Sequence, residues 1–341
     1  MKKKKITKAD LLKDVIIHVD PKSFDATPII NAYRGMSFTS RDIATATDIY
    51  DRMIRDKGCA IFLIVAGSTS AAGCKQVYID LIRNNMVDGI VMTGAQIVDM
   101  DFFEGLGFHH YKGTPYIDDK LLRKLYIDRI YDTFIDEVEL QKCDQAMAEV
   151  IGSLKPGAYS TREVVYQMGK FLTKHGKQDC IVSAAYDYDV PIWSHALIDS
   201  SFGFGAVKNR LANGGFILDV VKDFKELTEA KMATKSSGLF MIGGGGPKNF
   251  MQDTVVCAEV AFGKDCPMHK YAVQITVADS RDGACSSSTL KEALSWGKVN
   301  GAFEQMVYAE ASAVLPLMAS YLYHKGDWKK RKGMKLQSLF Q

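Results

Sequence analysis

A tryptophan and a lysine two residues apart, Trp296 and Lys298, form the pair with the clearest chemical potential in the sequence. An indole that shields an ammonium group from water favours the neutral amine, and a neutral lysine amine is a nucleophile toward carbonyl and imine carbon. The same spacing more commonly reflects a packed ring beside a lysine whose head group reaches solvent. The pair therefore indicates a candidate nucleophile, and the spacing alone leaves both interpretations open.

Five short apolar runs that do not alternate with polar residues are the elements that could position such a lysine. Runs of four to eight apolar residues are typical of strands in a parallel sheet covered by helices on both faces. Segments with helical periodicity separate the runs, so the pattern predicts an α/β fold with a Rossmann-like parallel sheet flanked by helices. The expected strands are residues 60–65, 89–92, 180–183, 238–242 and 271–277.

Three of the expected strands are followed by small residues, at positions 66–73, 93–96 and 243–247. Small residues at the carboxyl ends of parallel strands let a ligand approach the backbone, and the next helix N-terminus favours an anionic phosphate. None of the three segments contains a G-x-G-x-x-G fingerprint, and a tight strand-to-helix turn explains any one of them. The three together favour a nucleotide site.

The composition is that of a folded globular protein: 341 residues, 47% hydrophobic and 24% charged. The net charge of +3 is too small to indicate a nucleic-acid surface. Seven scattered cysteines without a C-x-x-C pair predict free thiols and no metal site. We expect a cytoplasmic protein, because no apolar run of signal-peptide length follows the lysine-rich start.

The chain shows no internal repeat and no long linker, so we expect one domain over residues 1–341, with a short, basic, flexible tail over about residues 1–10. Two domains would explain the pattern as well, with residues 99–144 as a charged, aromatic-rich insertion in the one-domain interpretation. The apolar segment from Ala311 to Tyr323 is too short to span a membrane. It is expected to form a buried helix.

The segment from Thr289 to Val299 contains Ser295-Trp296-Gly297-Lys298 and resembles the active-site segment of the deoxyhypusine synthase family, whose Ser-Trp-Gly-Lys motif carries a covalent lysine. The resemblance covers most of the chain and is closer to the bacterial deoxyhypusine-synthase-like and homospermidine-synthase-like branch than to the eukaryotic enzyme. Other landmarks in the family's order are Asn85-Met86-Val87-Asp88, Ala196-Leu197-Ile198-Asp199, Ile242-Gly243-Gly244-Gly245 and Tyr308-Ala309-Glu310-Ala311-Ser312.

The resemblance implies an NAD-dependent transfer of an aminobutyl group from spermidine through an imine on Lys298. Family members oxidise spermidine beside its secondary amine, release 1,3-diaminopropane, pass the four-carbon imine to an acceptor amine and reduce it with the same NADH. It further implies that Trp296 is a pocket wall and a cation–π partner of the polyamine. Glu292 matches an acid that holds an amine terminus, although an exposed helix carboxylate is the alternative.

For the cofactor, the resemblance implies a set of residues that bind NAD, and a homotetramer with the NAD sites at subunit interfaces. Glu310 stands where the family usually has aspartate, so it keeps the charge and reaches one methylene further. The implied cofactor residues are Gly67, Ser68, Thr69, Ser70, Ala71, Thr93, Gly94, Ala95, Asp199, Gly244, Gly245, Val277, Ala278, Asp282, Ser286, Glu310 and Ala311.

The implied polyamine site departs from the family at four positions. Asn249 replaces a histidine, Phe204 and Cys285 replace acids of eukaryotic members, and Asp253 introduces an acid in place of an asparagine. Because polyamines are polycations, these changes alter charge recognition. We expect a small-amine acceptor, with homospermidine as the product from putrescine; a protein lysine, as in deoxyhypusine formation, stays an alternative.

Two other classes of function remain open. A non-catalytic NAD-binding scaffold on the same fold would bind the cofactor without releasing a diamine, although such a protein has no need of a nucleophilic Lys298. A plain NAD-dependent amine dehydrogenase would accumulate NADH in step with product.

Overall fold

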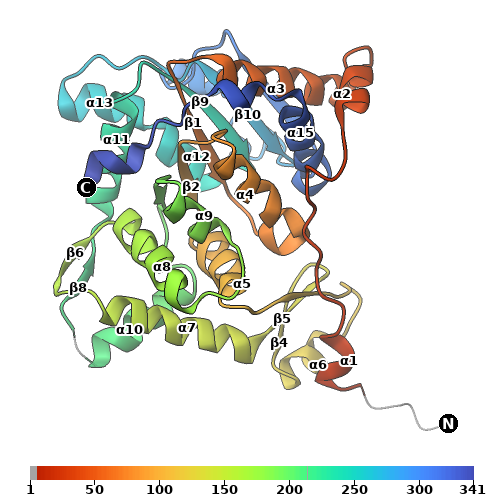
Figure 1. Ribbon diagram of the computed structural model, residues 1–341, viewed down its shortest axis with the longest axis vertical. Coiled ribbons are helices and arrows are strands. Elements are labelled where there is room, and N and C mark those ends of the chain that lie inside the picture. The colour runs from red at the N-terminus through yellow and green to blue at the C-terminus, as the bar shows by residue number, and fades with distance from the viewer. Residues whose placement is uncertain (1–5, 213) are drawn as a thin grey trace.

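A six-stranded, wholly parallel sheet forms the centre of the computed structural model, which describes residues 6–212 and 214–341. Its strand order is β11-β10-β9-β1-β2-β7 (Figure 1). This arrangement confirms the α/β fold predicted from the sequence. The strands are β1 (Cys59–Val65), β2 (Gly89–Met92), β7 (Ile192–Trp193), β9 (Ser236–Ile242), β10 (Tyr271–Thr276) and β11 (Glu304–Tyr308).

Both faces of the sheet are buried, which is why its strands carry apolar residues without alternation. All seven residues of β1 are buried. Ile61 and Leu63 belong to the core on one face, whereas Phe62 and Ile64 belong to the core on the other. Successive side chains of a strand point to opposite faces, so one apolar run supplies two layers.

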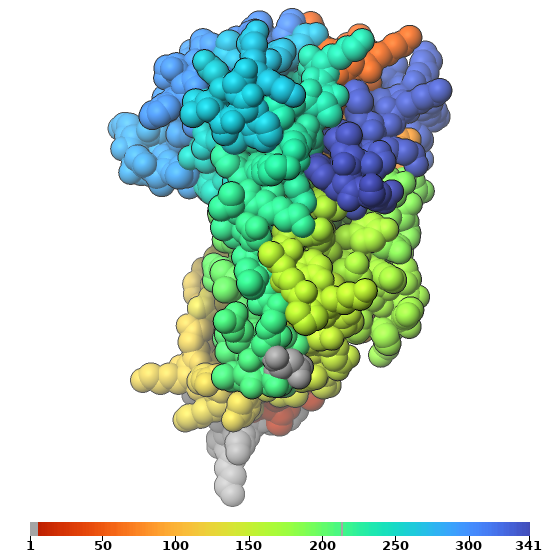
Figure 2. All heavy atoms as spheres, turned by 90° about the vertical axis from the view of Figure 1, so that its left-hand side faces the viewer, coloured from red at the N-terminus to blue at the C-terminus, as the bar shows by residue number. Residues whose placement is uncertain are grey.

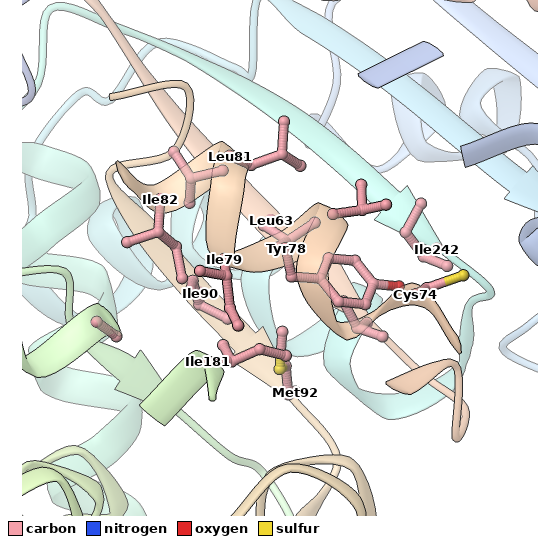
Figure 3. Close-up of a cluster of buried hydrophobic side chains, with 14 of the residues drawn as sticks. Leu63, Cys74, Tyr78, Ile79, Leu81, Ile82, Ile90, Met92, Ile181 and Ile242 are labelled. Carbon is pink, nitrogen blue, oxygen red and sulfur yellow. The ribbon is translucent and has the colours of Figure 1, made fainter. Parts of the chain in front are cut away.

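Helices α3 (Phe38–Arg55), α4 (Lys75–Arg83), α9 (Ile181–Asp187) and α15 (Ala311–Lys325) contribute side chains to the first of these cores. Figure 3 shows Tyr78, Ile79 and Ile82 of α4 beside the strand residues Leu63 and Ile90. Helix α15 confirms the buried helix expected over residues 311–323.

The second core lies under α11 (Val220–Met232), α12 (Gly245–Gln252) and α14 (Leu290–Ser295). Leu227 of α11, Met251 of α12 and Leu290 of α14 are buried with Phe62 of β1. Helices α12 and α14 carry Asn249 and Glu292, and Asp253, Trp296 and Lys298 follow the ends of these helices, so this second layer positions the candidate nucleophile.

Part of the chain extends the molecule away from the main sheet. Figure 2 shows the blue residues that follow β9 at one end and the yellow-to-green residues between about 110 and 215 toward the other. Two small sheets lie there, in the orders β3-β5-β4 and β6-β8. Their strands are β3 (His110–Lys112), β4 (Ile127–Ile130), β5 (Thr133–Asp136), β6 (Gly157–Tyr159) and β8 (Phe216–Leu218). The other helices are α1 (Lys8–Leu11), α2 (Thr27–Tyr33), α5 (Phe103–Gly105), α6 (Asp119–Lys124), α7 (Glu137–Gly152), α8 (Thr161–His175), α10 (Ser201–Ala212) and α13 (Thr254–Phe262), with π-helical turns over Ser70–Cys74 and Gln96–Phe102 and 3-10 turns over Asp327–Lys330 and Leu336–Phe340.

The strand predicted over residues 180–183 is wrong. Cys180 is the N-cap of α9, where the Ser183 hydroxyl and the cap backbone bond to each other, and the buried Asp101 carboxylate accepts from the Ile181 and Val182 N–H groups. These partners satisfy the first N–H groups of a helix, which the apolar run alone does not reveal. Four of the five predicted strands are present, whereas β7 and β11 of the main sheet and the five strands of the two small sheets were not predicted.

Part of the predicted N-terminal tail, residues 1–5, lies outside the described residues. Lys8 begins α1, and its Nζ bonds to Asp136 at 2.5 Å and to the Tyr126 carbonyl at 3.1 Å. The seven cysteines are free thiols, as expected. In the described part of the chain no helix has the length and apolar character needed to cross a membrane.

Candidate active site

A pocket with a volume of about 510 Å³ opens at the carboxyl ends of β1, β9 and β10. Carboxyl ends of parallel strands are where open α/β sheets bind ligands. Ten of the predicted cofactor residues line this pocket, and they come from five separate chain segments. They are Gly67, Ser68, Thr69, Gly244, Gly245, Val277, Ala278, Ser286, Glu310 and Ala311.

The pocket is chemically suited to a dinucleotide. Helix α12 begins at Gly245 on the pocket wall, and the free N–H groups of a helix N-terminus favour an anionic phosphate. Glu310 places a carboxylate on the opposite segment, where it also caps α15 by accepting from the Ala313 N–H at 3.2 Å. A carboxylate at such an edge can accept from a ribose diol. The residues present therefore fit NAD.

Seven predicted cofactor residues do not line the pocket in this single chain. Ser70 and Ala71 are buried in the π-helical turn, where the Ser70 N–H donates to Gln96. The Asp282 carboxylate accepts from the Ala284 N–H within its own loop, and Asp199 is exposed after β7. Thr93, Gly94 and Ala95 follow β2. Their part in cofactor binding stays a prediction.

The Ser-Trp-Gly-Lys segment is the C-terminal end of α14. The Lys298 N–H donates to the Ala293 carbonyl at 3.0 Å and the Gly297 N–H to the Leu294 carbonyl at 3.0 Å, which is the Schellman pattern of a helix end. Gly297 has φ of 69°, a left-handed conformation that other residues adopt at a cost. The glycine thus turns the chain between Trp296 and Lys298.

Lys298 lies between a carboxylate and an indole. Its Nζ is 2.6 Å from Oδ1 of Asp253 and 5.2 Å from the centre of the Trp296 ring. The Lys298 side chain is 12% exposed, whereas Trp296 is 69% exposed, so the ring covers the amine and faces outward itself. The predicted nucleophile and its predicted aromatic neighbour therefore lie within contact distance of each other.

Two further predicted residues extend this site along α12. Asn249 lies one helical turn before Asp253, and its Nδ2 donates to Sγ of Cys285 at 3.3 Å. The structure therefore brings five predicted residues together beside one face of α12: Trp296, Lys298, Asp253, Asn249 and Cys285. It places Phe204 elsewhere, exposed on α10.

Glu292 has a structural partner of its own. Its carboxylate accepts from the Thr289 N–H in a capping box, and hydrogen bonds from Thr289 lower the pKa of this exposed carboxyl. A hydrogen bond to the ionised form favours that form. This geometry matches the alternative of an exposed helix carboxylate, and the contact with an amine terminus stays a prediction.

Lys248 is a second lysine at the site, and the sequence interpretation missed it. Its side chain is buried, and its Nζ donates to the carbonyl of Ser288 at 2.6 Å and to its hydroxyl at 2.9 Å. Burial lowers the pKa of Lys248 to about 8, and the nearby Lys298 acts in the same direction. A lone lysine after a glycine run carries no signal of this burial.

Comparison with known proteins identifies the family of this chain. The family model described as Deoxyhypusine synthase matches residues 28–322. The chain belongs to the deoxyhypusine synthase family. It is 57% identical over 338 residues to a deoxyhypusine synthase-like protein of Coxiella burnetii, covering 98% of this chain and 96% of that protein. It is 54% identical over 340 residues to one from Caulobacter vibrioides, covering 98% and 92%.

The fold agrees with a solved structure of the deoxyhypusine synthase family. The crystal structure of a candidate deoxyhypusine synthase from Entamoeba histolytica matches with a TM-score of 0.60 and 18% identity, covering 91% of this chain and 97% of that chain. Membership of the deoxyhypusine synthase family supports a transferase, and the close bacterial relatives carry the qualified name deoxyhypusine synthase-like.

Proposed function

We propose that this protein transfers an aminobutyl group from spermidine or a related polyamine to a small acceptor amine, with NAD as cofactor and an imine on Lys298 as intermediate. With putrescine as acceptor the product is homospermidine. The observation that carries the proposal is the position of Lys298 Nζ, 2.6 Å from the Asp253 carboxylate and 5.2 Å from the Trp296 ring centre.

Lys298, Asp253 and Trp296 each have a task in this reaction. Bound NAD would accept hydride from the carbon beside the secondary amine and return it after transfer. Lys298 attacks the oxidised carbon as a neutral amine, and 1,3-diaminopropane leaves. The Asp253 carboxylate accepts a hydrogen bond from the Lys298 amine before that amine loses its proton. The Trp296 ring keeps water from the imine.

A small acceptor amine is favoured by the charges around Lys298. Asp253 supplies one carboxylate at the lysine, and Asn249 and Cys285 form a neutral pair one turn away. A polyamine held by one local carboxylate is recognised differently from one held by several acids. A protein lysine as acceptor is the outcome that would move the assignment toward deoxyhypusine formation.

We further propose a homotetramer in which a second copy covers the site. Trp296, Val277 and Leu294 are 69%, 75% and 45% exposed beside the pocket and the lysine. Apolar side chains gathered at a functional site support burial by another chain. A subunit that covers them would also exclude water from the imine. We also propose a cytoplasmic location, because the free thiols of this protein suit a reducing compartment.

The function is tested by incubating the protein with NAD and a panel of polyamines, with and without putrescine, and identifying products by mass spectrometry. The proposal predicts 1,3-diaminopropane and homospermidine, with no net NADH. NADH that accumulates with product would indicate an amine dehydrogenase. NAD binding without diamine release from any polyamine would indicate a scaffold.

A further inference from the structure

The His195 side chain lies against the N-terminal end of α12, at a position occupied by glycine. The imidazole follows β7 and rests over Gly246, the last of four consecutive glycines. A Cβ on residue 246 would lie 2.1 Å from Nε2 of His195, which is far inside contact distance. The close approach of ring and backbone therefore depends on the absence of a side chain at position 246.

The imidazole shares a helix face with the candidate nucleophile. Residues 246, 249, 250 and 253 recur at the three- and four-residue spacing that lines one side of a helix. His195 covers Gly246 at one end of this face, and Lys298 pairs with Asp253 at the other. Seven residues of α-helix span about 10 Å, so an extended amine along α12 could contact both ends.

The His195 ring lies over the residue that follows the pocket wall, because Gly244 and Gly245 line the pocket and immediately precede Gly246. Its ring centre lies 6.5 Å from that of Phe250, and Phe250 in turn stacks on Phe224 at 5.3 Å. The imidazole thus lies at the start of α12, near Phe250 and over the glycine that follows the pocket wall.

Neither ring nitrogen of His195 is paired with a residue that the structure describes. Nδ1 is buried and makes no hydrogen bond to any residue that the structure describes. Nε2, the nitrogen over Gly246, also makes no hydrogen bond to a described residue, and it is the nitrogen that a bound amine can reach because the protein covers Nδ1. Burial lowers the pKa of His195, which favours the neutral ring with one nitrogen able to accept a hydrogen bond.

We propose that His195 is a specificity-determining residue that accepts a hydrogen bond from a nitrogen of the bound polyamine at the cofactor end of α12. The inference rests on the proposed function and adds a residue to its substrate site. The donor is an amine N–H and the acceptor is an imidazole nitrogen, while Gly246 provides the space for the ring. Asp253 and Lys298 mark the other end of the same amine path.

Binding in the absence of turnover tests this inference. Spermidine is titrated calorimetrically into NAD-saturated Lys298→Ala and into NAD-saturated Lys298→Ala/His195→Ala. Loss of a hydrogen bond predicts a spermidine Kd about tenfold higher in the double variant, with the NAD Kd unchanged. His175→Ala in the same background is the matched control, because His175 is an exposed histidine on α8 away from α12.

A second variant keeps the test independent of the histidine's own removal. Gly246→Ala in the Lys298→Ala background leaves the imidazole in the chain but forces it out of place, so it should weaken spermidine in the same way. Combined with His195→Ala it should add nothing further. Equal spermidine affinity with and without His195 overturns the inference alone. Loss of NAD affinity together with spermidine affinity overturns it in favour of a structural role. Absence of spermidine binding in Lys298→Ala with NAD bound counts against the proposed function itself.

Discussion

Nζ of Lys298 lies 2.6 Å from Oδ1 of Asp253, and this pair joins the end of α14 to the end of α12. The two helices come from distant parts of the chain and meet on the same face of the parallel sheet. The ion pair therefore holds the candidate nucleophile against the helix face on which the amine substrate is proposed to lie.

Replacing this carboxylate should weaken amine recognition. Asp253→Asn keeps the side-chain shape and removes the charge beside Lys298, so the KM for spermidine is expected to rise about tenfold. The NAD Kd should be unchanged. Asp265→Asn, which removes an exposed carboxylate in the segment after α13, is the control for net charge. Steady-state kinetics with varied spermidine check the prediction, and an unchanged KM would contradict it.

The turn before Lys298 gives a second prediction. Gly297→Ala places a Cβ on a residue with φ of 69°, which costs about 1–2 kcal/mol of folding free energy. Gly263→Ala at the left-handed end of α13, with φ of 61°, should cost a similar amount. Urea unfolding should therefore show two equally destabilised variants. Only Gly297→Ala should lose turnover, because only that turn aims the lysine; equal turnover in both would count against this role.

The buried Lys248 predicts a pH dependence of stability. Its pKa in the folded protein, about 8, lies below its ordinary value of 10.5, so the unfolded chain binds more protons between these two pH values. The free energy of unfolding of wild type should therefore rise with pH across this window, by at most about 3 kcal/mol relative to Lys248→Met. Denaturant titrations at pH 8, 9 and 10 measure the difference. A constant difference between the two proteins would refute the shift.

The proposed homotetramer can be tested by substitutions in the exposed apolar side chains of α10. Phe204, Val207 and Leu211 recur along one side of this helix and are 71%, 58% and 84% exposed. Light scattering of wild type should give a mass four times 37.8 kDa. Leu211→Glu should shift the mass to smaller species, whereas Val260→Glu, on an exposed valine of α13, should not. A monomeric wild type would exclude the tetramer.

The strands and the lysine could be predicted from the sequence because both depend on short-range signals. An apolar run such as residues 60–65 reports its own burial on both faces, and Trp296 and Lys298 are joined by one turn. The run at residues 180–183 failed because the same apolar pattern suits a buried helix. Its helical state depends on Asp101, which lies 80 residues away.

The parts of the site that were missed depend on long-range packing. Lys248 is buried because the loop around Ser288 folds over it, and no feature of its neighbours in sequence indicates this. His195 reaches α12 only because β7 ends beside Gly246. The family resemblance supplied the cofactor residues, and the sheet topology explains why five separate segments of that set meet at one pocket.

Covalent trapping on Lys298 tests the central claim most directly. The protein is incubated with NAD and spermidine, reduced with borohydride, digested and analysed by mass spectrometry, with Lys298→Ala and Lys248→Met as parallel samples. Reduction converts an imine into a stable secondary amine, so wild type should carry an aminobutyl group on Lys298. Lys248→Met should be labelled at the same lysine, and Lys298→Ala should carry none. Wild type without label after incubation with spermidine and every other polyamine, or label on Lys248 in place of Lys298, would contradict the account.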